Sequence, residues 1–495
     1  MKKNIFLIFL LMFLSFVQAK SENTAIYEFG SSCFWIGAIR SDSAHIPAGK
    51  RFLSWEMGTP EYKAIWKNID PISRKSIILR KSVITKKEIK EAVTSICGLG
   101  HYEFSINGKK VGDGEFAPYW SDYDKTVYYN TFDVTSYLNK GENVFGVLLG
   151  NGFFNAQGGR YSKLKVSFGA PTLLFKTIIR FTDNSTEEIV SDGSWKYNFS
   201  PITFNDIYGG EDYDARLEQK NWNKAGFNDS NWKPVVIQDA PKGKLVVQKG
   251  YPIKIMEKLN FDRKKVTYLF RDNLDKLTKT PPSGGRGATA MVFDMQQNLS
   301  GFPEITVSGR RGDSITLIVG ESLTPEGAVN QRESGRPHFY TYILKGEKDE
   351  IWHPRFSYYG FKYIQVEGAV LKGDKNPQKL TVLKDIKSCF VYNSAPLIST
   401  FECSNELFNK THILIQKAIQ SNMQGVFTDC PHREKLGWIE QLHLNGPVLL
   451  YNYDLKDFLP KIMQDMVDAQ QPDGAVSSIA PMYNIFGNSN GFDDF

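Results

Sequence analysis

The sequence has few cysteines, and their number and spacing exclude two classes of protein. Among 495 residues there are five cysteines, Cys33, Cys97, Cys389, Cys403 and Cys430. An odd number at wide spacings excludes a dense disulfide framework and leaves no C-x-x-C pattern for a metal site. Cys389 and Cys403 are close enough in sequence to form a disulfide bond in an oxidising compartment. Buried free thiols are the alternative.

The sequence also lacks any block of like charges. Its 60 Lys and Arg against 54 Asp and Glu give a formal net charge of +6 that is spread along the chain. A nucleic-acid partner is therefore not expected. With 41% apolar and 23% charged residues the composition is that of a folded chain. The 13% of aromatic residues favours β-sandwiches and surfaces that stack on flat ligands.

Long hydrophobic runs are absent except at the N-terminus. Lys2 and Lys3 precede an apolar run over residues 5–14, and Val17-Gln18-Ala19 supplies small residues at cleavage spacing. This layout predicts a signal peptide at residues 1–19 and a secreted or periplasmic protein. The run is shorter than the ~20 residues that a transmembrane helix needs, so no membrane span is expected.

Most of the chain has the pattern of β-structure. Residues 102–106 alternate between apolar and polar side chains before Asn107-Gly108, which predicts a β-hairpin because both turn residues need positive φ. Residues 144–149 suit a buried strand, and a second β block runs from 291 to about 392. Arg311-Gly312-Asp313, between two strands of that block, is expected to be a hairpin turn rather than an adhesion motif.

After residue 403 the periodicity becomes helical. Ser404 is expected to cap a helix over residues 405–423, and Asp454 is expected to cap another. Gly446-Pro447 is expected to interrupt a third helical stretch between them. The order β, β, then α indicates separate domains rather than one βαβ sheet.

The densest polar cluster lies between the first two helical stretches, at residues 428–441. It holds Asp429 and Glu434 with Arg433 between them and Trp438 nearby, on a loop that Pro431 separates from the helix. Carboxylates and a guanidinium bind hydroxyls, and an indole packs on a sugar ring, so the cluster suits a sugar subsite. A carboxylate crowded by another acquires a raised pKa and can act as a general acid. An ordinary surface loop with an Arg–Glu pair is the alternative.

This segment resembles the catalytic motif of inverting bacterial α-L-rhamnosidases, glycoside hydrolase family 78. In that motif Asp-Cys-Pro, Gln or His, Arg, an acidic stretch and Leu-Gly-Trp follow one another. The similarity extends to further segments in both β blocks, at residues 102–112, 117–123, 148–152, 293–301 and 352–361.

The resemblance implies a multidomain fold. It predicts an N-terminal β-sandwich of jelly-roll or galactose-binding type at residues 20–270 and a concanavalin-like β domain at 271–397. Residues 398–495 would begin an (α/α)6 barrel. Because the barrel of this family has twelve helices, we expect the chain to be a fragment that lacks the rest of it.

The resemblance also implies a function, the release of terminal α-L-rhamnose from polysaccharides or glycosides with inversion of configuration. Glu434 matches the general acid, and Asp429 matches a residue that holds the rhamnose hydroxyls. Arg433 and Trp438 match other members of the subsite. Glu440 is a further candidate for substrate binding, next to Gln441 where many members carry an acidic residue.

Inversion needs a second carboxylate, ~6.5–9.5 Å from the first, to activate water. In the family it comes from a later part of the barrel, and no residue of this sequence is assigned to it. A non-catalytic carbohydrate-binding protein that retains the β domains and part of the subsite is therefore the alternative function. The oligomeric state is not predicted.

The reaction requires no cofactor. In some family members the first sandwich binds rhamnose through a calcium ion, which takes several oxygen ligands. Asn151, Asn205, Asp206 and Glu211 lie in segments that could supply such ligands. Turn residues without a metal are the alternative.

Overall fold

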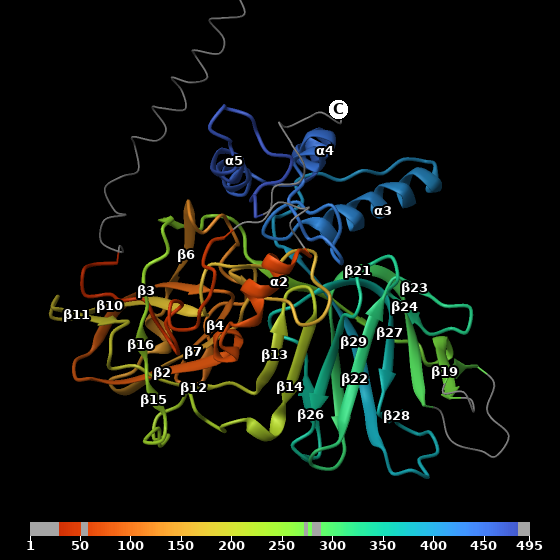
Figure 1. Cartoon of the computed structure of the whole chain (residues 1–495), viewed down its shortest axis with the longest axis horizontal. Helices are drawn as coiled ribbons and strands as arrows, with labels where there is room; N and C mark the ends of the chain where they lie inside the picture. Colours follow the sequence, from red (N-terminus) through yellow and green to blue (C-terminus); the bar gives the residue numbers. More distant parts are fainter. Residues whose placement is uncertain (1–28, 51–57, 272–275, 280–288, 484–495) are drawn as a thin grey trace, which may run out of the picture.

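The structure is a computed structural model that describes residues 29–50, 58–271, 276–279 and 289–483. The expected signal peptide at residues 1–19 lies outside the described residues. Figure 1 shows three parts: a β-sandwich in red to yellow, a larger β-structure in green to blue, and three helices in blue above both.

Two sheets form the sandwich. One has seven strands in the order β16–β1–β10–β3–β6–β17 with β11 paired to β10, and the other has six in the order β15–β12–β2–β7–β4–β5. The bounds of the first are β16 (Val236–Ile237), β1 (Ile36–Gly37), β10 (Thr172–Phe181), β3 (Ile89–Leu99), β6 (Thr126–Asp133), β17 (Lys244–Val247) and β11 (Thr186–Val190). Those of the second are β15 (Lys233–Pro234), β12 (Lys196–Phe199), β2 (Ile77–Thr85), β7 (Gly141–Leu149), β4 (Tyr102–Ile106) and β5 (Lys109–Lys110).

The core of the sandwich is aromatic. Phe175 of one sheet meets Phe104 and Phe145 of the other edge-on, with ring centroids 5.5 Å apart in both pairs. The expected hairpin is confirmed, since Asn107 and Gly108 have φ values of 52° and 81° between β4 and β5. The expected buried strand at 144–149 is confirmed as part of β7.

The second β-structure is a twelve-stranded sheet. Its main path runs β13–β14–β25–β22–β27–β21–β19–β20, and β29 pairs with β18, β21 and β28 while β26 pairs with β21. Its strands are β13 (Ile202–Asp206), β14 (Gly210–Asp214), β18 (Ile253–Asn260), β19 (Val266–Arg271), β20 (Leu277–Thr278), β21 (Ala290–Ser308), β22 (Ser314–Gly320), β25 (Phe339–Ile343), β26 (Glu350–Trp352), β27 (Tyr359–Glu367), β28 (Ala369–Leu371) and β29 (Thr381–Asn393). Because β14 pairs in parallel with β25, a segment from the N-terminal half of the chain joins this sheet.

The turn at Arg311-Gly312-Asp313 is confirmed, with a φ of 92° at Gly312. It does not close a hairpin, because β22 pairs with β25 and β27 rather than with β21. Two short pairs complete the described strands, β23 (Ser322–Leu323) with β24 (Val329–Asn330) and β8 (Asn155–Ala156) with β9 (Val166–Ser167).

The helices differ from the sequence expectations at three points. The described α-helices are α2 (Pro60–Lys67), α3 (Glu406–Asn422), α4 (Ile439–Asn452) and α5 (Leu459–Asp468), and the 3₁₀ turns are η3 (Pro71–Arg74), η4 (Thr135–Tyr137), η5 (Ala215–Leu217) and η6 (Arg263–Lys265). Ser404 does not cap α3, because the side chain of Asn405 accepts the N–H of Leu407 at 3.0 Å. Asp454 does not cap α5, which begins at Leu459, and Pro447 lies inside α4 without interrupting it.

Buried aromatic and charged groups hold the helical segment against the sandwich. Trp120 stacks on Phe153 with centroids 4.1 Å apart, and Tyr483 meets Trp120 edge-on. In α5 the Lys461 amino group binds the Asp465 carboxylate at 2.6 Å, and both side chains are buried. The Lys461 amino group also lies 5.9 Å from the ring centroid of Tyr119 and 5.8 Å from that of Trp120, so α5 packs on the loop at residues 117–123.

Large apolar side chains are exposed on the outward faces of the three C-terminal helices. Examples are Leu407 and Leu414 of α3, Leu444 and Tyr451 of α4, and Val467 of α5, each more than 60% exposed. These faces have the character of packing surfaces, unlike the polar face that a solvated helix presents.

The cysteines are all free. Of the two alternatives, the Cys389–Cys403 bridge is not formed: Cys389 lies buried on β29, whereas Cys403 is half-buried before α3. Buried free thiols, the alternative, are found at Cys97 and Cys389. Within the described ranges no helix has both the length and the apolar character to cross a membrane.

Close backbone contact at Gly210 makes the pairing of β14 with β25 sensitive to substitution. Gly210 has a φ of 97°, and a Cβ there would lie 2.0 Å from the carbonyl oxygen of Phe339. We expect Gly210→Ala to lower the free energy of unfolding by about 3 kcal/mol more than Gly226→Ala. Gly226 has a φ of 75° with open space around it, so Gly226→Ala measures the cost of a side chain at positive φ without a steric clash. Urea unfolding of both variants measures the difference, and equal midpoints would contradict it.

Candidate active site

The loop between α3 and α4, residues 423–438, carries the sequence-predicted site. Its middle is closed by two backbone bonds: the N–H of Asp429 donates to the carbonyl of Leu436, and that of Lys435 donates to the carbonyl of Cys430. Lys435 has a φ of 55°, which reverses the chain before α4. The expected position of the cluster on a loop next to a helix end is confirmed.

A buried lysine attaches this loop to the β-structure below it. The amino group of Lys435 donates to the backbone carbonyls of Ile207, after β13, and Tyr358, before β27. It also lies 4.4 Å from the ring centroid of Tyr358. Burial disfavours the ammonium form and lowers the pKa of Lys435 to about 7.

Glu434 lies at the centre of the site with both carboxylate oxygens bound. Oε1 accepts from the amino group of Lys163 at 2.9 Å, and Oε2 accepts from the indole N–H of Trp438 at 2.9 Å. Burial raises the pKa of Glu434, but the bonds from Lys163 and Trp438 outweigh burial and leave the pKa below its ordinary value. In this arrangement Glu434 is ionised.

Asp429 is the neighbouring carboxyl group and has the opposite shift. Burial and, to a smaller degree, the nearby charge of Glu434 raise the pKa of Asp429 above its ordinary value. Its Oδ1 is buried and has no hydrogen-bond partner among the described residues. The two carboxyl groups titrate as a pair that holds a proton preferentially on Asp429.

The other sequence-predicted residues are less closely associated with this pair. The guanidinium of Arg433 donates to the carbonyl of Glu333 at 3.1 Å, and its Nε lies 3.9 Å from Glu434 Oε1. Glu440 lies in the first turn of α4, and in the described part of the chain no hydrogen bond or ion pair joins it to Asp429 or Glu434.

Several site residues were not predicted. Lys163 comes from the loop between β8 and β9, 271 positions before Glu434, and no local pattern marks it. The hydroxyl of Tyr208 donates to the backbone carbonyl of Glu434 at 2.8 Å. His432 lies with Nε2 3.4 Å from Glu321, and its pKa is raised to about 9 because Cys430 and Glu321 outweigh burial.

The four residues considered for calcium lie together, but protein groups already occupy their oxygens. Asp206 accepts three backbone N–H groups at 2.9–3.0 Å, and Glu211 accepts two at 3.1 Å. Asn151 and Asn205 bind one another, and burial raises the pKa of Glu211 to about 8. Throughout the described ranges no group of three or more His, Cys, Asp or Glu could hold a metal ion. This donor set does not fit calcium as it stands.

Two adjoining carboxyl groups with separated pKa values are what acid-assisted cleavage of a glycosidic bond uses. In this chain the pair lies on a helical segment that packs against two β parts. The chain matches three family models in order. They are the alpha-L-rhamnosidase N-terminal domain at residues 87–257, the bacterial alpha-L-rhamnosidase concanavalin-like domain at 286–392 and the bacterial alpha-L-rhamnosidase 6 hairpin glycosidase domain at 396–493. The chain belongs to the bacterial α-L-rhamnosidase family, glycoside hydrolase family 78.

Known relatives agree with this assignment. An alpha-L-rhamnosidase of Formosa agariphila is 35% identical over 397 residues, which cover 78% of this chain and 39% of the relative. One of Streptomyces avermitilis is 31% identical over 454 residues, 90% of this chain and 40% of the relative. The structure of alpha-L-rhamnosidase from Dictyoglumus thermophilum superposes with a TM-score of 0.74 at 30% identity, covering 92% of this chain and 46% of that one. The Streptomyces avermitilis enzyme complexed with L-rhamnose gives 0.71 at 29% identity, with 84% and 38% covered. The chain thus spans less than half the length of these relatives.

The depressed pKa of Lys435 predicts a pH dependence of stability. Between about pH 7 and its ordinary pKa of 10.5 the unfolded chain binds more protons at this residue than the folded chain. The contribution of Lys435 to the free energy of unfolding therefore rises with pH across this window and is lowest below it. We expect the parent to gain stability relative to Lys435→Met between about pH 7 and 9 in urea unfolding. Lys264→Met, at an exposed position, is the control. If the free energy of unfolding changes with pH in the same way for the parent and Lys435→Met, burial does not lower the pKa of Lys435.

Proposed function

We propose that the protein hydrolyses terminal α-L-rhamnosidic bonds with inversion of configuration. The observation that carries this is the geometry of Glu434, which the indole of Trp438 and the amino group of Lys163 bind on its two oxygens, beside Asp429, whose pKa burial raises. Its segment lies within the matched 6 hairpin glycosidase domain. The related Streptomyces avermitilis enzyme, described in complex with L-rhamnose, supports the choice of sugar.

The proton follows a short route in this proposal. Glu434, once protonated, donates its proton to the glycosidic oxygen as the bond between that oxygen and the anomeric carbon breaks. Water attacks the anomeric carbon from the opposite face and gives its proton to a base carboxylate, which no described residue is assigned to be. Asp429, whose pKa is raised, holds the proton that the pair shares and can return it to Glu434.

Substrate binding has to loosen the contact between Lys163 and Glu434, because the ammonium group lowers the pKa of Glu434 and leaves little of it protonated and able to donate. Lys163 is partly exposed, with 27% of its side chain accessible, so a sugar hydroxyl can compete for its amino group. Trp438 supplies an apolar ring beside the carboxylate against which a sugar ring can pack.

The proposal extends to the helical domain, the location of the protein and its substrates. The exposed apolar faces of α3, α4 and α5 suit packing against further helical hairpins, as an (α/α)6 barrel would provide. The expected signal peptide at residues 1–19 supports a secreted or periplasmic location. Rhamnose-containing polysaccharides or glycosides are the proposed substrates.

One observation favours the alternative, a carbohydrate-binding protein without catalysis. Lys163 and Trp438 together stabilise the ionised form of Glu434, which suits a hydrogen-bond acceptor for sugar hydroxyls as well as it suits an acid at rest.

Glu434→Gln separates the two functions. An amide cannot protonate the leaving oxygen, so we expect hydrolysis of 4-nitrophenyl α-L-rhamnoside to fall by at least about 100-fold. Release of 4-nitrophenolate measures the rate, and Glu406→Gln on the exposed surface of α3 is the control. Equal activity of Glu434→Gln and the parent would show that Glu434 is not the general acid. No turnover by the parent, with its melting temperature still raised by L-rhamnose, would establish the binding function instead.

Lys163→Met tests whether the ammonium group of Lys163 controls the pKa of Glu434. Loss of the ammonium group removes the interaction that lowers the pKa of Glu434, so the pKa rises. Since the acid must be protonated, the alkaline limb of the pH profile of kcat/KM should move to higher pH. Lys165→Met, two positions along, changes a lysine that forms no ion pair with a described carboxylate. An alkaline limb at the same pH in Lys163→Met as in the parent would show that Lys163 does not control Glu434.

A further inference from the structure

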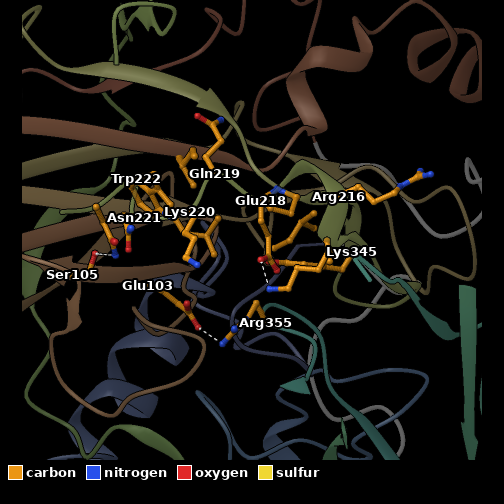
Figure 2. Close-up of a pocket in the computed structure, with 18 of the residues that line it drawn as sticks. Glu103, Ser105, Arg216, Glu218, Gln219, Lys220, Asn221, Trp222, Lys345 and Arg355 are labelled. Carbon is orange, nitrogen blue, oxygen red and sulfur yellow. Dashed lines mark hydrogen bonds and ion pairs between the residues drawn. The ribbon is translucent and has the colours of Figure 1, made fainter. Parts of the chain in front are cut away.

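A second candidate site lies at the junction of the two β parts, on different residues from the loop that carries Glu434. It is a cleft of about 640 Å³, lined by residues of β4 and β5, by the segment 215–223 and by the loops around Arg311 and Lys345. Figure 2 shows its charged side chains. No residue of the 423–438 loop lines it. The volume is in the range of small-molecule sites, about 300–1,000 Å³.

The lining has more cations than carboxylates. The cations are Lys110, Arg216, Lys220, Arg311, Lys345 and Arg355, and the carboxylates are Glu103, Glu218 and Glu347. Every one of these carboxylates already has a cation: Arg355 is 3.3 Å from Glu103, and Lys345 is 2.7 Å from Glu218 and 3.4 Å from Glu347. Lys110 and Arg216 bind carboxylates outside the lining, Glu115 at 3.0 Å and Asp214 at 2.7 Å.

Two cations are left without an ion-pair partner among the described residues, Lys220 and Arg311. The guanidinium of Arg311 donates only to backbone carbonyls, those of Lys345 and Arg216, both at 3.4 Å, and Asp214 influences it only through space. Lys220 is exposed, and Figure 2 shows its amino group directed to the part of the cleft where Glu103 and Glu218 lie. The cleft therefore has an uncompensated positive charge with free donor capacity.

A rigid aromatic surface lies beside these cations. Trp222 lines the cleft and stacks on Trp232, with ring centroids 6.0 Å apart and an angle of 29°. The indole of Trp232 is itself fixed by a 2.8 Å bond to Gln219. The side chain of Asn221 also lines the cleft and adds amide groups that can bind hydroxyls. An indole with amides nearby suits the flat face and hydroxyls of a sugar ring.

We propose that this cleft binds an acidic saccharide, a sugar chain carrying carboxylate or sulfate groups, with Lys220 and Arg311 on the anion and Trp222 against a sugar ring. The saccharide class rests on the proposed function, whereas the preference for an anion rests on the lining charges alone. Such a site would hold an acidic glycan on the β-structure while a terminal sugar of the same chain is cut elsewhere.

Calorimetric titration of the chain with three oligosaccharides tests the proposal. Tetragalacturonate carries carboxylates, a carrageenan tetrasaccharide carries sulfates, and cellotetraose carries neither. We expect at least one acidic oligosaccharide to bind, with affinity that falls as salt increases, and cellotetraose to bind at least about tenfold more weakly. The acidic oligosaccharide that binds more tightly shows whether the cleft prefers carboxylate or sulfate groups. Equal binding of cellotetraose, or binding of inorganic sulfate as tight as that of the sulfated chain, would overturn the assignment.

Variants locate the binding. Lys220→Glu and Arg311→Glu should each weaken it by at least about tenfold, and Trp222→Ala should weaken it also. Lys264→Glu makes the same charge change at an exposed position on η6, outside the cleft, and should bind as the parent does. If Lys220→Glu and Lys264→Glu have the same effect, the cleft is not the site. Binding by Glu434→Gln should equal that of the parent, so a failure of the proposed catalysis leaves this result intact.

Discussion

The candidate active site depends on one buried contact, the amino group of Lys435 held between the backbone carbonyls of Ile207 and Tyr358. Ile207 follows β13 and Tyr358 precedes β27, and both strands belong to the twelve-stranded sheet. A lysine without a carboxylate partner is costly to bury, so the contact persists only because both carbonyls are satisfied by it. It therefore fixes the position of the adjoining Glu434 relative to the twelve-stranded sheet.

This constraint explains why the site draws on elements far apart in the sequence. With the loop fixed, Lys163 of the β8–β9 loop reaches Glu434, and Tyr208 binds the backbone of the same residue. The lowered pKa of Glu434 and the raised pKa of Asp429 are consequences of that arrangement. The β parts thus contribute to the chemistry directly, by setting the charge of the carboxyl pair, as well as by supporting the helices.

Local features were predictable from sequence, and contacts across the chain were not. The hairpin at Asn107-Gly108 and the loop that carries Glu434 follow from turn chemistry and from a proline, which act within a few residues. The ion pair of Lys163 with Glu434 depends on tertiary packing, for which a lone lysine gives no signal. Gly446-Pro447 predicts a break in the helix, but α4 continues through Pro447.

The most direct test of the account is hydrogen–deuterium exchange of the loop at residues 428–438 in the parent and in Lys435→Met. If Lys435 fixes the loop, its amide groups are protected in the parent and exchange faster in the variant, together with peptides around residues 207 and 358. Lys410→Met, on the exposed surface of α3, should leave these peptides unchanged. Equal protection of the loop in the parent and in Lys435→Met would contradict the central role of this contact.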